Sequence, residues 1–205
     1  MRQSGQKTFF TDFLEGGPSL MFFVVWRLTG EMEAAGLSAS ALALIVFLLL
    51  RVLKAPLHPV MLGVNLHILL IAPALSVLFR FGGPLGSAAG GVLLPFAQSG
   101  VLVSVLLTGI VLTVIRPSGF AGLGGLSKRM SLTYSVLMLC IAATGAVWAV
   151  FYADQAFAPV AITLAALFVL RRYLVARQKD HVSAASLAVP STIAMRVISS
   201  GTPQK

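Results

Sequence analysis

Charged residues are scarce in this chain of 205 residues: only 10% are Asp, Glu, Lys or Arg, and just six are acidic. Apolar residues make up 58% of the sequence, and the mean hydropathy is +0.94. A water-soluble domain of this size has too little interior to hide so much apolar surface. The composition therefore excludes an ordinary soluble domain and predicts one domain that lies in a lipid bilayer.

Cysteine and histidine are also scarce, which limits the chemistry available. The single cysteine, Cys140, excludes an intrachain disulfide. His58 and His67 are about 13 Å apart along one helix, so they cannot ligate one haem iron, and His181 follows the last apolar run. No acidic residue in the inner half of an apolar run accompanies His67. We therefore expect no metal site, no cofactor and no catalytic residues of the Ser-His-Asp type.

The two ends of the chain are less apolar than the middle. Residues 1–17 lack an apolar core and a small-residue cleavage site, so we expect no cleaved signal peptide and a cytoplasmic N-terminal segment. The apolar pattern ends after Arg177. Residues 178–205 are rich in Ser and Ala without a sustained period, which predicts a disordered cytoplasmic tail.

Six apolar runs between these ends approach the roughly 20 residues that a helix needs to cross the hydrocarbon. They cover residues 18–35, 37–53, 60–81, 92–115, 130–152 and 156–176. Turn-forming stretches separate most of them, including KAPLHP, GGPLGSAAGG, RPSGFAGLGG and ADQ. We predict an all-α, polytopic membrane bundle with about six transmembrane helices in residues 18–177. The short first two runs have an alternative interpretation as a re-entrant hairpin.

The basic residues indicate the orientation of this bundle. If both termini lie on one side, that side holds every Lys and Arg except Arg27 and Arg80, or 13 of 15. Because Lys and Arg concentrate in cytoplasmic loops, we predict that both termini are cytoplasmic. Membrane topology thus explains the net charge of +9 without a nucleic-acid partner.

Polar residues near the predicted outer boundary form one candidate site. Arg27 and Glu31 are four residues apart and would share a helix face if the first helix continued to residue 35. One interpretation is a solvated pair at a helix end. The other is an outer-interface polar site completed by Arg80, since ionisable residues in membrane spans are often functional.

The stretch HPVMLGVNLHILLIAPAL, residues 58–75, holds a second candidate site. Asn65 and His67 are two residues apart, so they point to different faces of the third helix. Pro73 leaves a carbonyl near residue 69 without a donor and is expected to kink the helix. These three residues either bridge neighbouring helices or line a small polar cavity.

Small residues predict close helix packing in two places. Gly100, Ser104 and Thr108 repeat every four residues in the fourth run, and Ala142, Ala143, Gly145 and Ala146 cluster in the fifth. Such stripes let neighbouring helices approach closely. Packing within the chain is the simpler interpretation, and a dimer seam is the alternative.

Three stretches resemble the bacterial intracellular septation protein A family and its septation-like relatives. They are GGPSLMFFVVWRLTG, TVIRP and KRMSLTYSVLMLCIAATGAVWAVFY. The features that carry the resemblance are Phe22–Phe23 before Arg27 and Gly30, the Arg116–Pro117 exit, and the Lys128–Arg129 entry to Tyr134, where relatives often have Trp. The resemblance implies a small, multi-pass inner-membrane protein linked to cell-envelope upkeep and division, and it supplies no catalytic residues.

These observations lead to three functional hypotheses. The first is a non-enzymatic envelope protein that acts through helix–helix contacts with other membrane proteins. The second is a small-molecule transporter or channel that uses Asn65, His67 and Pro73. The third is a membrane enzyme that acts on a lipid at Arg27, Glu31 and Arg80. The sequence does not indicate an oligomeric state.

Overall fold

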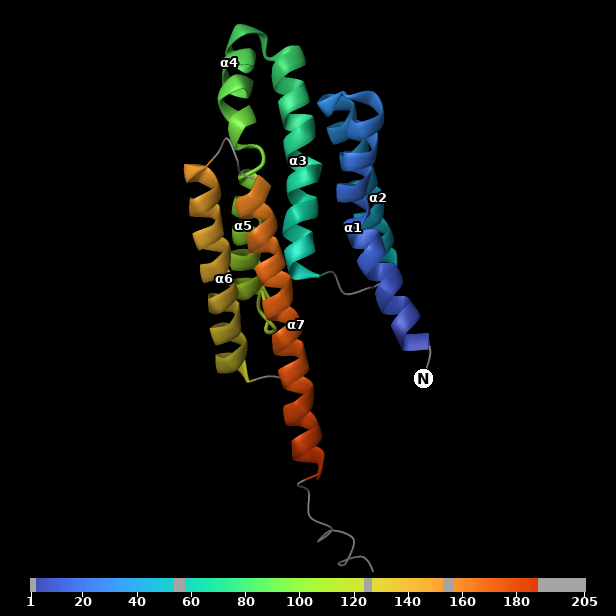
Figure 1. The fold of residues 1–205 in the computed structure, drawn as a ribbon, viewed down its shortest axis with the longest axis vertical. Coiled ribbons are helices and arrows are strands. Elements are labelled where there is room, and N and C mark those ends of the chain that lie inside the picture. Colours follow the sequence, from blue (N-terminus) through green and yellow to red (C-terminus); the bar gives the residue numbers. More distant parts are fainter. Residues whose placement is uncertain (1–2, 54–57, 124–126, 153–156, 188–205) are drawn as a thin grey trace, which may run out of the picture. The chain divides into compact units, whose positions relative to one another are not determined.

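A computed structural model describes residues 3–53, 58–123, 127–152 and 157–187 (Figure 1). The described residues form helices without any β-strand. The helices are α1 (Gln3–Thr29), α2 (Met32–Val52), α3 (Pro59–Phe81), α4 (Gly83–Leu93), the 3₁₀ helix η1 (Leu94–Phe96), α5 (Gly100–Ile115), α6 (Lys128–Phe151) and α7 (Phe157–Leu187). The chain divides into two compact units, Met1–Phe168 and Val169–Lys205. The predicted all-α fold is confirmed.

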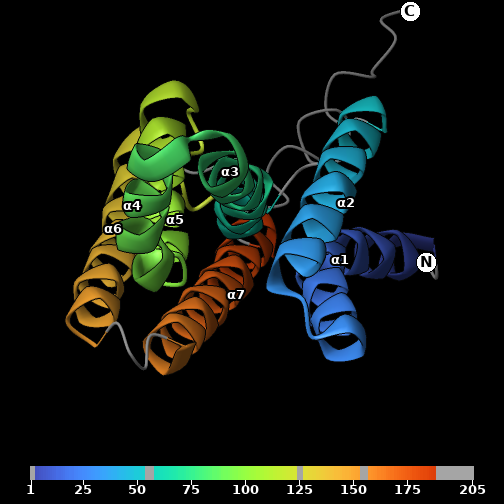
Figure 2. The ribbon, with the colours of Figure 1, turned by 90° about the horizontal axis from the view of Figure 1, so that it is seen from above.

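Within the first unit, neighbouring helices pack in series. α1 and α2 form a hairpin, and α2 also packs on α3 (Figures 1 and 2). The second half of α3 contacts α4, where Phe79 meets Gly90, while its first half contacts α5, where Gly63 meets Val105. α5 then packs on α6. α3 is therefore the central helix of this unit, in contact with α1, α2, α4 and α5.

The sequence predicted a turn near residue 36, but the turn between α1 and α2 lies at Gly30. Gly30 has φ +71°, and its N–H donates to the carbonyl of Trp26 at 2.8 Å, as at a helix end with a left-handed residue. Gly36 lies inside α2, where an added Cβ would be 2.8 Å from Ala72 Cβ. Its small size therefore serves packing against α3 and not a turn.

The first helix begins well before the predicted start at residue 18. α1 starts at Gln3 and continues through Pro18, which is buried. Proline removes one backbone hydrogen bond and commonly bends a helix. Figure 2 shows α1 changing direction between its dark-blue first half and its second half. The cytoplasmic location of residues 1–17 remains a prediction.

The predicted fourth span is not a continuous helix. The segment GGPLGSAAGG, expected to be a turn, forms most of α4, and the chain then bends by 82° between Gly83–Phe96 and Gly100–Ile115. Pro95 lacks an N–H and interrupts the helical hydrogen bonding at this point. The glycines of α4 instead permit close packing, since a Cβ at Gly90 would lie 2.7 Å from Phe79 Cζ.

The last helix also departs from the prediction. α7 continues to Leu187 and so includes the first ten residues of the predicted tail, while 188–205 lie outside the described residues. The disorder of the tail stays a prediction. Residues 171–187 contain neither Gly nor Pro, and eight of these 17 residues are Ala, Leu or Arg, which have high helix propensity. Local propensity therefore extends this helix beyond its apolar part.

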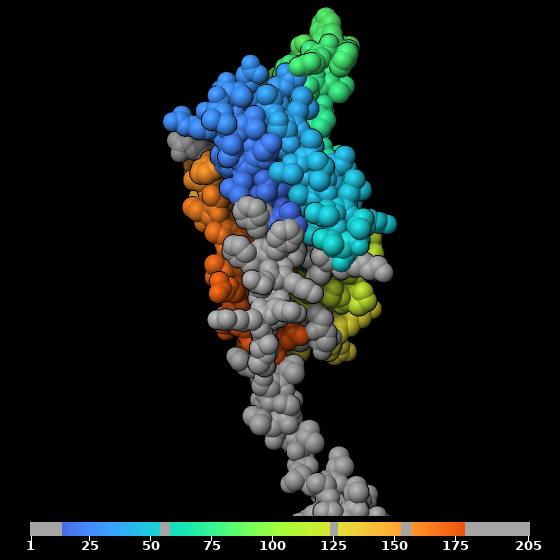
Figure 3. Space-filling view, turned by 90° about the vertical axis from the view of Figure 1, so that its right-hand side faces the viewer, coloured from blue at the N-terminus to red at the C-terminus, as the bar shows by residue number. Residues whose placement is uncertain are grey.

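Among the described residues, four helices are long and apolar enough to cross a membrane: α2, α3, α6 and the Phe157–Gln178 part of α7. The bent pair formed by α4–η1 and α5 gives a fifth if it counts as one span. α1 is not among these helices, so the six predicted spans are not confirmed. Large apolar side chains are exposed on these helices and on α1, which with α2 forms the blue-to-cyan surface in Figure 3.

Candidate functional site

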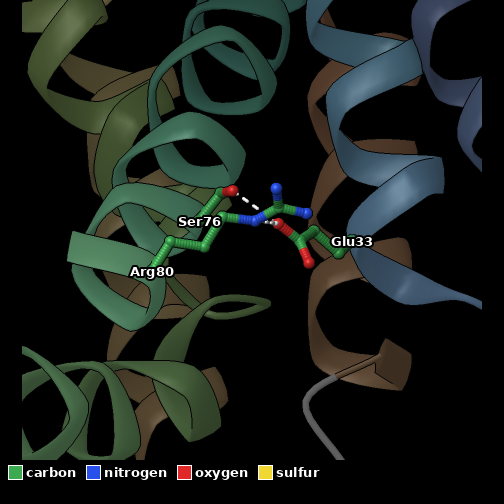
Figure 4. A network of polar contacts seen from close by, with 3 residues as sticks. All are labelled: Glu33, Ser76 and Arg80. Carbon is green, nitrogen blue, oxygen red and sulfur yellow. Dashed lines mark hydrogen bonds and ion pairs between the residues drawn. The ribbon is translucent and has the colours of Figure 1, made fainter.

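Three residues form a polar cluster where α2 begins and α3 ends (Figure 4). Glu33 Oε1 accepts hydrogen bonds from Arg80 Nε at 2.8 Å and from Ser76 Oγ at 2.5 Å. Ser76 and Arg80 are four residues apart on α3, so they share one face. Both charged side chains are about half exposed, at 62% for Arg80 and 47% for Glu33. The cluster is thus an accessible ion pair that joins two helices.

The structure changes the predicted membership of this site. Arg80 pairs with Glu33. The condition under which Arg27 and Glu31 would share a helix face is not met. α1 ends at Thr29, and Glu31 is the extended residue before α2. The backbone N–H of Glu31 donates to Thr29 Oγ1 at 3.1 Å. Arg27 and Glu31 are both exposed, and no ion pair between them is found in the described part of the chain.

His67 lies inside the first unit and is bound on both ring nitrogens. Nε2 is 2.8 Å from the carbonyl of Ala97, and Nδ1 is 3.1 Å from Ser104 Oγ. A carbonyl only accepts, so Nε2 carries the proton; in the neutral ring, Nδ1 then accepts from the Ser104 hydroxyl. His67 therefore ties α3 both to α5 and to the bend that precedes α5.

The predicted packing stripe on α5 faces this histidine. A Cβ at Gly100 would lie 2.9 Å from His67 Cε1, and Ser104 forms the hydrogen bond described above. Thr108, one turn further, is buried. Gly100 and Ser104 of the predicted packing stripe therefore contact His67 of the predicted polar site, and this contact lies within one chain.

Asn65 points toward a different helix, as its spacing from His67 predicted. Its Nδ2 donates to the backbone carbonyl of Glu15 on α1 at 3.1 Å. Asn65 Oδ1 is buried and has no hydrogen-bond partner within the described ranges. The side chains of Asn65 and His67 therefore bind α1 and α5 separately and share no partner.

Glu15 is a functional candidate that the sequence analysis missed. The residue is 2% exposed, and its Oε1 accepts the backbone N–H of His58 at 3.0 Å, at the start of α3. The His58 ring lies 4.9 Å from the ring of Phe168. A carboxylate at a helix N-terminus is favoured by the helix dipole. The available signal was an acidic residue three positions before Pro18, but the prediction assigned it to a segment outside the bundle.

Pro73 lies within α3, which continues to Phe81 without interruption. One turn earlier, the carbonyl of Ile68 accepts the hydroxyl of Ser40 on α2 at 2.6 Å. Ala72 lies against Gly36 of the same helix. Ile68 and Ala72, which precede Pro73, therefore take part in a close α2–α3 contact.

The described side chains include no group of three or more His, Cys, Asp or Glu that could hold a metal ion. Comparison with known proteins gives no further assignment: no family model matches the chain. No curated protein and no solved structure matches it either.

Proposed function

We propose that this chain is a multi-pass protein of the bacterial inner membrane, with both termini cytoplasmic, that acts without catalysis through helix–helix contacts with envelope proteins. The resemblance to the septation protein A family supplies the cellular context. The first span would then be formed by α1 and the fourth by the bent pair α4–α5, which restores six crossings. The distribution of Lys and Arg supports this orientation.

One observation carries this proposal: His67 satisfies both ring nitrogens within the chain. Asn65 likewise donates to a backbone carbonyl of α1. These polar groups therefore hold helices together, and their geometry favours packing over a substrate cavity. The surface that remains for partners is apolar, with Val24 53% and Leu28 80% exposed on α1.

Site-specific photo-crosslinking in native membranes tests the proposal. Photoreactive residues at Val24 and Leu28 should give discrete adducts with the same envelope or division proteins, identified by mass spectrometry. A probe at Leu85, which is 85% exposed on α4, controls for random encounters. Adducts with lipid alone, or the same proteins from all three positions, would contradict the proposal.

A second candidate function, a small-molecule transporter or channel, is favoured by the 82° bend between Gly83–Phe96 and Gly100–Ile115. Broken helices in membrane proteins place backbone polar groups at binding sites or water-lined cavities. Here the bend exposes the side chain of Gln98, next to Ala97, whose carbonyl binds His67.

Cysteine accessibility distinguishes the two functions. Cys140, in the middle of α6, is first replaced by Ala, so that the introduced cysteine carries the only thiol in each variant. New cysteines at 65, 67, 69 and 98 are then treated with a small polar thiol reagent in intact membranes. Strong labelling at 67 and 98 would support a water-lined path. Absence of labelling at all four positions would eliminate the transporter.

A further inference from the structure

Three basic residues gather where α5 ends and α6 begins. Arg116 follows α5, while Lys128 and Arg129 open α6, and all three are exposed. Gly109 faces Leu139 across the antiparallel pair, so Arg116 lies level with about residue 132. Lys128 and Arg129 are then only about one helical turn away along the axis, roughly 5 Å.

The segment between the two helices holds this arrangement in place. Phe120 and Ala121 are buried, and the Ala121 N–H donates to Ser135 Oγ at 3.2 Å. Gly119 has φ +61°, and a Cβ there would be 3.4 Å from Ser131 Oγ. The residues that follow Arg116 therefore pack directly against the first turns of α6, close to Lys128 and Arg129.

These positive charges have no anionic partner among the described residues. Residues 34–153 contain no Asp or Glu, and within the described ranges none of the three basic residues forms an ion pair. Cations in the first turn of a helix also oppose the helix dipole. Lys128 and Arg129 occupy that turn, and Ser127 caps it by accepting the Met130 N–H at 3.4 Å. The arrangement therefore favours an added anion.

The surface next to these cations is apolar. Val114 and Ile115 on α5 are 80% and 72% exposed, and Leu132 on α6 is 52% exposed. A soluble anion such as free phosphate would not be stabilised by contact with these apolar side chains. A phospholipid presents a negative headgroup directly above its acyl chains, which matches a cationic cluster beside exposed aliphatic side chains.

We infer that Arg116, Lys128 and Arg129 form a binding site for the headgroup of an anionic phospholipid, whose acyl chains lie along Val114, Ile115 and Leu132. The inference rests on the membrane location in the proposed function but not on any protein partner. It gives the three cations a role beyond topology.

Native mass spectrometry of the delipidated full-length protein in a neutral detergent tests the inference. The probes are phosphatidylglycerol and phosphatidylcholine with identical acyl chains. Phosphatidylglycerol should bind more tightly, and each of Arg116→Gln, Lys128→Gln and Arg129→Gln should weaken it by about fivefold. Arg51→Gln, an exposed cation in the last turn of α2, is the matched control and should change nothing.

Two further measurements make the outcome decisive. Binding of phosphatidylcholine by each variant verifies that the protein remains folded. Raising the salt concentration should weaken phosphatidylglycerol binding selectively. Equal binding of both lipids, an unchanged preference in the triple variant, or full competition by millimolar inorganic phosphate would overturn the inference. Because no partner protein is present, these results are independent of the crosslinking experiment.

Discussion

His67 shows what a buried polar residue does in this chain. Its Nε2–H donates to Ala97 and its Nδ1 accepts from Ser104, so a neutral ring satisfies all of its hydrogen-bonding capacity. Gly100 leaves the space that the ring occupies. The histidine and the glycine therefore act as a pair, and their coupling is measurable.

A double-mutant cycle tests this pair. His67→Ala should lower the free energy of unfolding in detergent by about 1–2 kcal/mol, because two interhelical hydrogen bonds are lost. Gly100→Ala should destabilise by a similar amount, since its Cβ would meet the ring. In the double variant the clash disappears, so its loss in free energy of unfolding should be smaller than the sum of the losses in the two single variants. Leu66→Ala, on the exposed side of α3, is the control, and strict additivity would contradict the contact.

The ion pair of Glu33 and Arg80 should matter less for stability. Both side chains are about half exposed, and exposed ion pairs contribute little. Arg80→Gln should therefore lower the melting temperature less than His67→Ala does, and the difference from wild type should shrink in high salt. A larger loss than that of His67→Ala would indicate that the cluster of Glu33, Ser76 and Arg80 is buried by a partner or by lipid.

At the scale of helices, small residues determine which surfaces meet. Ala142, Gly145 and Ala146 are buried on α6. Val160 and Leu164 of α7 pack against the buried cluster of Leu102, Ala146 and Ala149. A Cβ at Gly145 would lie 2.7 Å from Thr163 Cβ. The stripe predicted on the fifth run thus forms an intrachain seam with the first part of α7.

Two glycine substitutions distinguish the effect of helix packing on stability from the effect of helix propensity. Gly145→Ala should destabilise the protein by about 1–3 kcal/mol, because Thr163 cannot move without disturbing the seam. Gly91→Ala, in α4 with no atom near the added Cβ, should instead stabilise by about 0.5–1 kcal/mol. Thermal unfolding in detergent measures both. Thr163→Ala should partly rescue Gly145→Ala, and equal effects at the two glycines would contradict the seam.

At the scale of the whole molecule, the number of helices that cross the membrane depends on α1. α1 is not among the four or five helices that meet the length and hydropathy requirement. It nevertheless forms a hairpin with α2, which does. The location of the N-terminus depends on whether α1 crosses, so a topology measurement decides it.

Reporter fusions should place the N-terminus and positions 54, 129 and 177 in the cytoplasm. Positions 33, 86 and 154 should be external, because the Lys and Arg residues concentrate on the other side. An external N-terminus with every other position unchanged would mean that α1 does not cross. A cytoplasmic signal at 154 would instead overturn the predicted orientation of α6 and α7.

The sequence by itself determined the all-helical class and its small-residue contacts. Long apolar runs without acidic residues have few alternatives to helices, because every backbone group in hydrocarbon must be hydrogen-bonded internally. Helical spacing alone also indicated that Asn65 and His67 serve different neighbours and that Gly100 and Ser104 lie on a packing face. These properties follow from local geometry.

Only the tertiary structure decided which polar groups meet. Glu33 pairs with Arg80, Glu15 accepts the N–H of His58, and His67 binds the carbonyl of Ala97. Each contact joins residues at least 30 positions apart in the sequence. The roles of Gly30 as a turn and Gly36 as a contact were likewise indistinguishable in sequence, because the same absent side chain permits both a left-handed backbone and a close approach.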